Sequence, residues 1–322
     1  MKAIVYEKYG PPEDVLELME IEKPEPKADE VLVEIFAASV NFNDLAFVNG
    51  EPVLSRLWTG FLKPKHKILG TDIAGRVEAV GKNVTGIKPG DEVFAEIGND
   101  GYGAFAEYVT VPGKTVVIKP TNISFEEAAA VPQAAVTALQ GLRDQIQIQP
   151  GHKVLVNGAS GGIGTFAVQL AKSFDAEVTG VCSTDNLEVV QSIGADFVID
   201  YKQEDFTKGE KKYDLILDIV ANRPTSQYMQ ALAPQGAYVA VAFNPQTIFL
   251  GSIISKADGK KAGSLMAKPS ISDLKEVRVL IEAGKISPVI DKVFPLRETA
   301  RAIKYYGEGA QGKVVISMDT QE

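Results

Sequence analysis

The sequence is short of the residues that bind metals and form cross-links. Its 322 residues include one cysteine, Cys182, and two histidines, His66 and His152. A single cysteine excludes an intramolecular disulfide and a cysteine zinc cluster. Two histidines cannot build a multi-histidine metal site unless carboxylates complete it. Metal centres that rest on cysteine or on several histidines are therefore excluded.

Long apolar runs and an excess of positive charge are also missing. No run approaches the roughly 18 apolar residues that a membrane-spanning helix needs. Met1 is followed by KAIVYE, a strand-like stretch without the apolar core of a signal peptide. The formal net charge of -9 argues against a general affinity for nucleic acid or anionic membranes. We therefore expect a cytoplasmic protein with a small-molecule substrate.

The first third of the chain reads as β-rich. A chain of 322 residues exceeds one typical core, so two domains are expected. Regularly spaced short strands, separated by Gly, Pro and Asp turns, indicate a small barrel within residues 1–120. The expected strands are Ala3–Tyr6, Glu30–Ala37, Ala74–Val80, Glu92–Ala95 and Phe105–Val111.

The pattern changes at Ser124. Ser124-x-x-Glu127 is a capping-box sequence, and an Ala-rich helix is expected to continue towards Leu142. Strands and helices then alternate, which predicts a parallel sheet with right-handed crossovers. The expected strands are Lys153–Asn157, Glu177–Val181, Phe197–Asp200, Leu215–Ile219 and Ala237–Ala242, and the expected helices are Gly162–Ser173 and Leu187–Ile193.

The C-terminal part resembles the first region again. Two helices, Asp273–Ala283 and Glu298–Tyr306, precede a strand at Lys313–Ser317. This order indicates that the C-terminus completes the barrel domain. We expect an α/β protein in which residues 1–124 and 269–322 form one domain and residues 125–268 form the other.

A glycine-rich turn follows the strand Lys153–Asn157. Within it, Ala159-x-Gly161-x-x-Gly164 fits the Rossmann phosphate-binding fingerprint with alanine in the first position. Glycines let the backbone approach a pyrophosphate, and a helix N-terminus offers free amides. The strand before the turn, the helix after it and the later βαβ units supply the context that a lone glycine motif lacks. We predict a dinucleotide site here.

The end of the next strand favours NADPH over NADH. NAD sites usually carry a carboxylate about 20 residues beyond the loop. Here that place holds Ser183 and Thr184, followed by Asp185 and Asn186. Hydroxyl and amide groups can donate to a 2′-phosphate, which a carboxylate would repel. Asp185-x-x-Glu188 is itself a capping-box sequence, so we expect Asp185 to begin the next helix.

These motifs resemble a known family. The glycine-rich segment is similar to the signature of quinone oxidoreductases and zeta-crystallin, zinc-free members of the medium-chain dehydrogenase/reductase superfamily. The resemblance covers nearly the whole chain. The matching motifs are Gly151-His152-x-x-Leu155-x-x-x-Ala159-Ser160-Gly161-Gly162-x-Gly164, Gln169-x-x-Lys172, Ser39-Val40-Asn41-x-x-Asp44, Gly70-Thr71-Asp72-x-Ala74-Gly75, Gly90-Asp91-x-Val93, Gly194-Ala195-Asp196 and Gly312-Lys313-Val314-Val315.

The resemblance implies a fold and a set of cofactor contacts. It implies a GroES-like β-barrel catalytic domain, built from both chain ends, beside a doubly wound Rossmann domain that binds NADPH. Several NADPH-dependent relatives have lysine where Asn186 stands, which weakens the NADPH preference without reversing it. The residues that the resemblance places at the cofactor are Asn41 and Thr137 near the nicotinamide, Ser160, Gly161, Gly162 and Ile163 at the pyrophosphate, Ser183, Asn186 and Tyr201 around the 2′-phosphate, Phe243 at the nicotinamide end, and Lys313 near the phosphates.

The resemblance also explains the missing metal ligands. Alcohol dehydrogenases of the superfamily bind catalytic zinc through Cys, His and a further Cys or acidic residue. The matching places here hold Asn41, Thr71 and about Gln133, whose neutral side chains make a poor zinc site. Without a Lewis acid, hydride transfer suits an acceptor that is already electrophilic, such as a quinone or an α,β-unsaturated carbonyl.

The catalytic roles stay open on sequence alone. Asn41 either donates to the acceptor oxygen or holds the nicotinamide ribose or a turn. Asp44 either buffers protons or bonds backbone amides. Two rival functions remain: a trans-2-enoyl thioester reductase, and an NADPH-binding structural or regulatory protein with little turnover. Apolar runs at Ala237–Ala242 and Thr247–Ile254 are candidates for joining sheets edge to edge in a homodimer.

Overall fold

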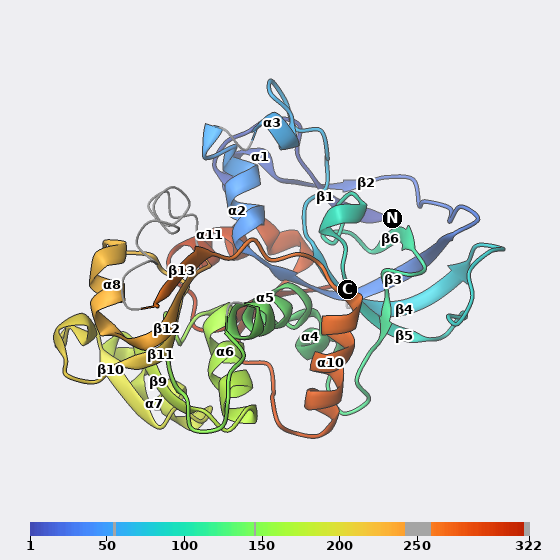
Figure 1. Cartoon of the computed structure of the whole chain (residues 1–322). Coiled ribbons are helices and arrows are strands. Elements are labelled where there is room, and N and C mark those ends of the chain that lie inside the picture. The colour runs from blue at the N-terminus through green and yellow to red at the C-terminus, as the bar shows by residue number, and fades with distance from the viewer. Residues whose placement is uncertain (54–55, 145, 242–258, 319–322) are drawn as a thin grey trace. The chain divides into compact units, whose positions relative to one another are not determined.

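The computed structural model describes residues 1–53, 56–144, 146–241 and 259–318. Its contacts divide the chain into two compact units, and each is described by itself (Figure 1). The first unit comprises Met1–Gln133, Pro269–Glu282 and Pro288–Glu322, and the second comprises Ala134–Lys268 and Ala283–Ser287.

The first unit is built on a seven-stranded sheet. Its order is β14-β15-β3-β4-β5-β7, and β6 also pairs with β3. The strands are β3 (Glu30–Val40), β4 (Asp72–Val80), β5 (Glu92–Glu96), β6 (Tyr108–Pro112), β7 (Val117–Ile118), β14 (Ile290–Pro295) and β15 (Lys313–Ser317). β15 runs antiparallel to β3, with Val314 opposite Val40. The prediction that the C-terminus completes this domain is therefore confirmed.

Apolar side chains on β3 and its neighbours form the core of this unit. Val33, Ile35 and Ile73 are buried among the side chains of that core. A separate pair of strands, β1 (Lys2–Val5) and β2 (Glu17–Glu20), lies outside the large sheet. The helices of this unit are α1 (Pro12–Val15), α2 (Phe42–Asn49), α3 (Arg56–Thr59), α4 (Phe125–Ala129), α10 (Ile271–Glu282) and α11 (Thr299–Gly307), with short 3₁₀ turns at Gly98–Asp100 and Leu296–Glu298.

The second unit contains a six-stranded parallel sheet in the order β10-β9-β8-β11-β12-β13. The strands are β8 (Lys153–Asn157), β9 (Glu177–Cys182), β10 (Phe197–Asp200), β11 (Tyr213–Asp218), β12 (Leu232–Ala240) and β13 (Lys261–Ser264). The helices are α5 (Pro132–Arg143), which begins in the first unit, α6 (Gly162–Ser173), α7 (Leu187–Ser192) and α8 (Thr225–Ala231), with 3₁₀ turns at Thr184–Asn186 and Phe206–Lys208. Numbered from β8, this order is the doubly wound 3-2-1-4-5-6 order of the Rossmann fold, as predicted.

Two expectations about single elements were wrong. The helix expected from Ser124 to Leu142 is two helices, because α4 ends at Ala129 and Pro132 opens α5. Proline is tolerated at the first position of a helix but not inside one. The run Ala237–Ala242 is not an edge strand where it is described, because β12 pairs with β11 on one side and β13 on the other. Residues 247–254 lie outside the described residues.

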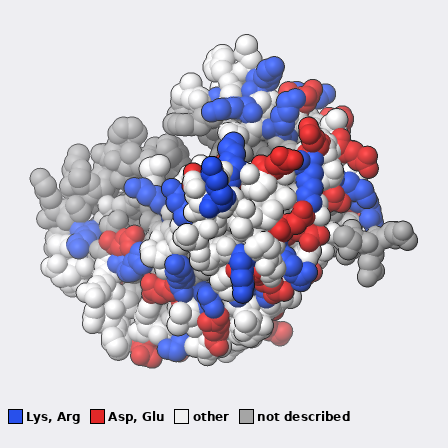
Figure 2. Space-filling view, turned by 90° about the vertical axis from the view of Figure 1, so that its right-hand side faces the viewer, with Lys and Arg blue, Asp and Glu red and all other residues white. Residues whose placement is uncertain are grey.

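The surface charge is mixed. Figure 2 shows one face, on which Lys and Arg side chains are interspersed with Asp and Glu rather than gathered into one basic area. Among the described helices, none has the length and hydropathy that crossing a membrane requires.

Candidate active site and cofactor-binding loop

Asn41 stands where β3 ends and α2 begins. Its extended backbone makes it the N-cap of α2, and its amide N donates to Asp44 Oδ2 at 2.8 Å. The other oxygen, Asp44 Oδ1, accepts from the amide N of Gly70 at 3.0 Å. Asp44 is completely buried. The interpretation that Asp44 bonds backbone amides is therefore confirmed.

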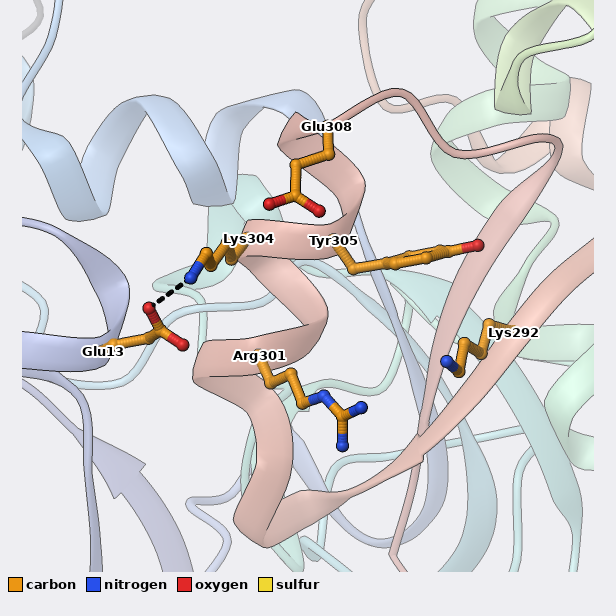
Figure 3. Close-up of a pocket in the computed structure, with 6 residues that line it drawn as sticks. All are labelled: Glu13, Lys292, Arg301, Lys304, Tyr305 and Glu308. Atoms are coloured by element: carbon orange, nitrogen blue, oxygen red, sulfur yellow. Dashed lines mark hydrogen bonds and ion pairs between the residues drawn. The ribbon is translucent and has the colours of Figure 1, made fainter.

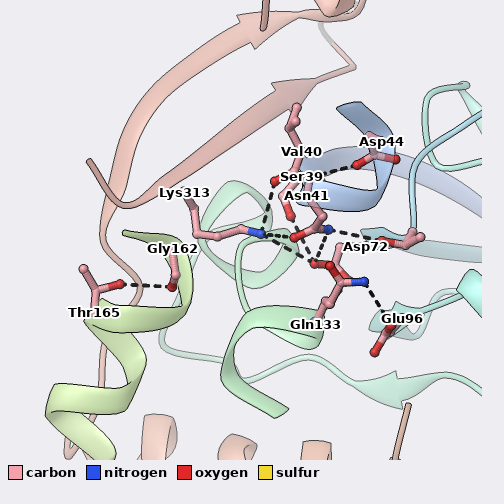
Figure 4. Close-up of polar contacts among 11 residues, drawn as sticks. Ser39, Val40, Asn41, Asp44, Asp72, Glu96, Gln133, Gly162, Thr165 and Lys313 are labelled. Atoms are coloured by element: carbon pink, nitrogen blue, oxygen red, sulfur yellow. Dashed lines mark hydrogen bonds and ion pairs between the residues drawn. The ribbon is translucent and has the colours of Figure 1, made fainter. Parts of the chain in front are cut away.

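The side chain of Asn41 is enclosed by hydrogen bonds within the first unit (Figure 4). Its Nδ2 donates to Thr71 Oγ1 and to Asp72 Oδ2, both at 3.1 Å, and its Oδ1 accepts from Lys313 Nζ at 2.6 Å. An amide nitrogen carries two hydrogens, and both are used here. This arrangement favours a positioning role for Asn41 over donation to an acceptor oxygen.

Lys313 is the first residue of β15 and lies almost completely buried. Besides Asn41, its ammonium reaches the Val40 carbonyl O at 3.4 Å and Asp72 Oδ2 at 3.8 Å. A buried ammonium needs such partners to offset the loss of hydration. Its expected approach to the cofactor phosphates stays a prediction.

The Asp72 carboxylate accepts hydrogen bonds from side chains and backbone on three segments of the chain. Ser39 Oγ donates to its Oδ2 at 3.2 Å, and the backbone N of Gln133 donates to its Oδ1 at 3.1 Å. The Asn41 amide and the Lys313 ammonium complete the set. Asp72 belongs to a sequence motif but was not predicted as a site residue. Its partners come from β3, α5 and β15, which are far apart in the chain, so the sequence does not show that they meet.

Glu96 is a second residue of this cluster that the sequence did not predict. It ends β5 directly opposite Asp72 on β4, and Gln133 Nε2 donates to its Oε1 at 3.2 Å. Burial, and then the charge of Asp72, raise the pKa of Glu96 to about 7. Burial also raises the pKa of Asp44 to about 7. The only sequence signal for Glu96 was its place at a strand end, which does not reveal the residue opposite.

The side chains at the family's zinc-ligand places do not fit the metal. Asn41, Thr71 and Gln133 are neutral, and the Asn41 oxygen already accepts from the Lys313 ammonium, which would repel a cation. In the described part of the chain, no three His, Cys, Asp or Glu side chains are grouped so that they would hold a metal ion.

The loop after β8 has the geometry that a pyrophosphate needs. Gly161 is the N-cap of α6 with an extended backbone, and the nearest neighbour of an added Cβ would be the Gly158 carbonyl O at 3.6 Å. An added Cβ on Gly164 would instead collide with that carbonyl. Gly161 therefore leaves open space at the helix N-terminus, and Gly164 lets α6 approach the strand end closely.

Two of the residues expected around a 2′-phosphate, Ser183 and Asn186, lie together with Ser160, which was expected at the pyrophosphate. Asn186 Nδ2 donates to Ser160 Oγ at 3.0 Å and to Ser183 Oγ at 3.1 Å. Asn186 is 8% exposed, and its Oδ1 is buried without a hydrogen-bond partner in the described structure. An unsatisfied buried acceptor is costly, which indicates that a ligand or water completes the site. Tyr201 is half-exposed, and its backbone N donates to the Cys182 carbonyl O at 3.1 Å.

The expected role of Asp185 as a helix cap was wrong. Asp185 lies within the 3₁₀ turn Thr184–Asn186, and α7 begins at Leu187 with Asn186 as its N-cap and no side-chain cap bond. The Asp185 carboxylate is exposed and lies 3.7 Å from Lys202 Nζ. The 3₁₀ turn shifts the helix start, so the spacing needed for a capping box is lost.

The remaining predicted residues are placed as follows. Thr137 is buried on α5. Gly162 and Ile163 begin α6 in the loop just described. Phe243 lies outside the described residues. Cys182 is buried, and burial raises the pKa of its thiol to about 11, so the thiol packs in the core and is a poor nucleophile.

A separate hollow of about 280 Å³ lies on the first unit (Figure 3). Its lining mixes both signs: Lys304 pairs with Glu13 at 2.7 Å, and Arg301 pairs with Glu298 beside it at 3.0 Å. It contains none of the predicted site residues, so it is distinct from the cluster around Asn41.

Comparisons with known proteins agree with this geometry. The family described as "Alcohol dehydrogenase GroES-like domain" matches residues 27–121, and that described as "Zinc-binding dehydrogenase" matches residues 193–316. A chloroplast quinone oxidoreductase of Triphysaria versicolor is 32% identical, with 98% of each chain covered. An NADPH-dependent alkenal/one oxidoreductase of Arabidopsis thaliana is 34% identical over 98% of this chain and 79% of its own. The structure of the quinone oxidoreductase from Coxiella burnetii matches with a TM-score of 0.89 and 30% identity, covering 99% of each chain.

The fold and the similarity together define the class of the protein: a GroES-like domain joined to a Rossmann domain. The chain belongs to the zinc-free quinone oxidoreductase and enone reductase branch of the medium-chain dehydrogenase/reductase family. The neutral side chains of Asn41, Thr71 and Gln133 agree with the zinc-free branch, although one matching family carries a zinc-binding description.

Proposed function

We propose that this protein is a metal-independent NADPH-dependent oxidoreductase that reduces a quinone or an α,β-unsaturated carbonyl. The observation that carries the proposal is that Asn41, Thr71 and Gln133 are neutral, whereas a zinc ion would need anionic or imidazole ligands at these places. The Lys313 ammonium also donates to the Asn41 oxygen. A centre of this kind suits an acceptor that needs no Lewis acid.

The residues of the second unit fit a dinucleotide. When bound, the reduced nicotinamide supplies the hydride, which is the chemistry of the cofactor rather than of the protein. The open space at Gly161 admits a pyrophosphate, and Ser160, Ser183 and Asn186 present hydroxyl and amide groups. Both features support cofactor binding at the end of β8.

The proposal includes a preference for NADPH. No carboxylate stands at Ser183, where an NAD site usually has one. A half-turn of the Asn186 amide exchanges Nδ2 and Oδ1, so its N–H groups become available to a 2′-phosphate while the serine hydroxyls donate to Oδ1. The NADPH-dependent alkenal/one oxidoreductase supports the preference by its name. Binding titrations with NADPH and NADH test it, and equal or tighter binding of NADH would contradict it.

One screen tests the activity. Oxidation of NADPH is followed with quinones, enones and enoyl thioesters, in the presence of a chelator. Turnover of quinones or enones supports the proposal. A lower Michaelis constant for enoyl thioesters would identify a trans-2-enoyl thioester reductase, a function that the trans-enoyl reductase of Aspergillus terreus carries in its name. Saturable NADPH binding without oxidation would identify a binding protein instead.

The proposal also includes a cytoplasmic location and a small-molecule substrate. The single cysteine supports a location that does not depend on disulfides. A homodimer stays a prediction, and sedimentation of the purified protein would test it.

A further inference from the structure

Strand pairing forces two acidic side chains together in the first unit. Asp72 on β4 and Glu96 on β5 are direct partners in an antiparallel register, so the ladder holds their backbones at neighbouring positions. Like charges directly opposite each other on paired strands are destabilising. A proton on one of the two carboxyls removes this repulsion.

Hydrogen bonds decide which carboxyl carries that proton. Asp72 accepts from Ser39, Asn41 and Gln133 N and lies near the Lys313 ammonium. Asp44 accepts two backbone N–H bonds. Among the described residues, the structure records one hydrogen bond to Glu96, from Gln133 Nε2. The anion of Glu96 is therefore the least supported of the three.

Exposure separates Glu96 from the other carboxyls. Asp44 and Asp72 are 0% exposed, whereas Glu96 is only partly buried. A proton on Glu96 can therefore exchange with solvent, whereas protons on the fully buried Asp44 and Asp72 cannot. The charged and titratable groups that face Glu96 are Asp72 on β4, Lys313 on β15, and Tyr102 in the segment after the Gly98–Asp100 turn. Burial, followed by the charges of Asp44 and Glu96, raises the pKa of Tyr102.

We propose that Glu96, held in place by Gln133, is the acid that protonates the oxygen of the reduced substrate. This role rests on the proposed function. Hydride adds to a carbon of the acceptor and leaves negative charge on its oxygen. The Glu96 O–H bond then breaks, an O–H bond forms on the substrate, and the Glu96 carboxylate recovers a proton from water. Gln133 Nε2 occupies Oε1, which leaves the other oxygen to carry the transferred proton.

The pH dependence of kcat/KM tests this role. For wild type we expect a plateau at low pH and a tenfold fall per pH unit above about pH 7, because the acid must be protonated. In Glu96→Gln the inflection disappears and kcat falls by about 100-fold, the scale of general acid catalysis, with unchanged NADPH affinity. Glu96→Asp retains an inflection and recovers part of the rate.

A matched control lies on the same strand. Glu92 is partly exposed at the start of β5 and pairs with Arg76 and Lys119, both at 3.5 Å. Glu92→Gln removes the same charge from the same strand, and we expect it to leave kcat and the pH profile unchanged. An equal effect of both substitutions would show a general charge effect and overturn the assignment.

Infrared spectroscopy reads the proton without any turnover. The buried Asp44, whose pKa burial also raises to about 7, contributes to the protonated-carboxyl C=O band at pH 6 in every variant. We therefore expect the wild-type band to lose intensity in Glu96→Gln and to keep it in Glu92→Gln. A wild type without NADPH oxidation would defeat the proposed function and with it the catalytic role of Glu96. An active wild type whose profile and band are unchanged in Glu96→Gln would defeat the role of Glu96 alone.

Discussion

Two glycines of the loop after β8 meet different physical demands. Gly164 has no room for a side chain, because an added Cβ would collide with the Gly158 carbonyl O. Gly161 has room and an ordinary φ of -81°. A larger side chain at Gly161 therefore needs no strained backbone, and its cost falls on whatever binds at the helix N-terminus.

We predict that Gly161→Val weakens NADPH binding by at least about tenfold and leaves the fold intact. The branched side chain occupies space that the pyrophosphate needs, and several backbone amide contacts, each worth about 1 kcal/mol, are lost together. Calorimetric titration beside circular dichroism measures both effects. Gly164→Ala is the contrasting variant, destabilised by about 1–3 kcal/mol through overpacking. A folded Gly161→Val protein that binds NADPH like wild type would place the cofactor elsewhere.

Ser183→Asp tests the cofactor preference at one position. Ser183 Oγ accepts from Asn186 Nδ2 at 3.1 Å, so an aspartate here puts a carboxylate beside the proposed 2′-phosphate site. Like-charge repulsion should weaken NADPH binding, whereas the ribose hydroxyls of NADH gain an acceptor. We expect the ratio of the two dissociation constants to invert. An unchanged ratio would remove Ser183 from the site.

At the scale of elements, two sequences of the same capping-box type have different outcomes. Ser124 Oγ accepts from the Glu127 amide N at 3.1 Å, and Glu127 Oε2 accepts from the Ser124 amide N at 2.8 Å. Asp185 makes no corresponding bonds, because a 3₁₀ turn precedes α7. The motif therefore caps a helix only where the chain enters that helix directly.

The two positions give a matched pair of variants. Ser124→Ala should lower the free energy of unfolding by about 1 kcal/mol, because the first amides of α4 lose their acceptor. Asp185→Ala removes only an exposed contact with Lys202 and should change the free energy of unfolding by less than about 0.5 kcal/mol. Urea denaturation measures both. If both substitutions lowered the free energy of unfolding equally, the side-chain cap on α4 would not stabilise the protein.

At the scale of the whole molecule, the buried carboxyls link stability to pH. Folding raises the pKa of Asp44 and Glu96 to about 7 from ordinary values near 4, and that of Asp72 in the same direction. Between these limits the folded state binds more protons than the unfolded state. The free energy of unfolding therefore falls as pH rises from about 4.5 to 7. Folding lowers the pKa of other groups, such as Asp196 and Asp205, and these groups affect stability only below this pH range.

We predict that the urea midpoint decreases from pH 5 to pH 7 and then levels off. Each group contributes on the order of 1 kcal/mol per pH unit at most. Glu96→Gln should make the decrease shallower, because the amide cannot ionise, whereas Glu92→Gln should follow wild type. A midpoint that rises steadily from pH 5 to 8 would contradict the raised pKa values.

Features that depend on residues close together in the chain were predicted better than features that depend on residues far apart. The strand Lys153–Asn157, the helix Gly162–Ser173 and the strand Lys313–Ser317 agree with the structure at both ends. The break at Pro132 was readable from proline chemistry but was missed within an Ala-rich run. Asn41 and Asp44 were found through their motif, whereas Glu96 carried no motif that marked it.

The sequence by itself determined the division into a β-rich and an alternating β/α region, many of the strands and helices, the glycine loop and the absence of zinc ligands. These features depend on residues close together in the chain, on periodicity and on side-chain chemistry. Only the tertiary structure decided that Glu96 lies opposite Asp72 and that Lys313 reaches Asn41 across 272 positions. Strand register and the return of β15 to β3 set these contacts, and both depend on how the whole sheet packs around its core.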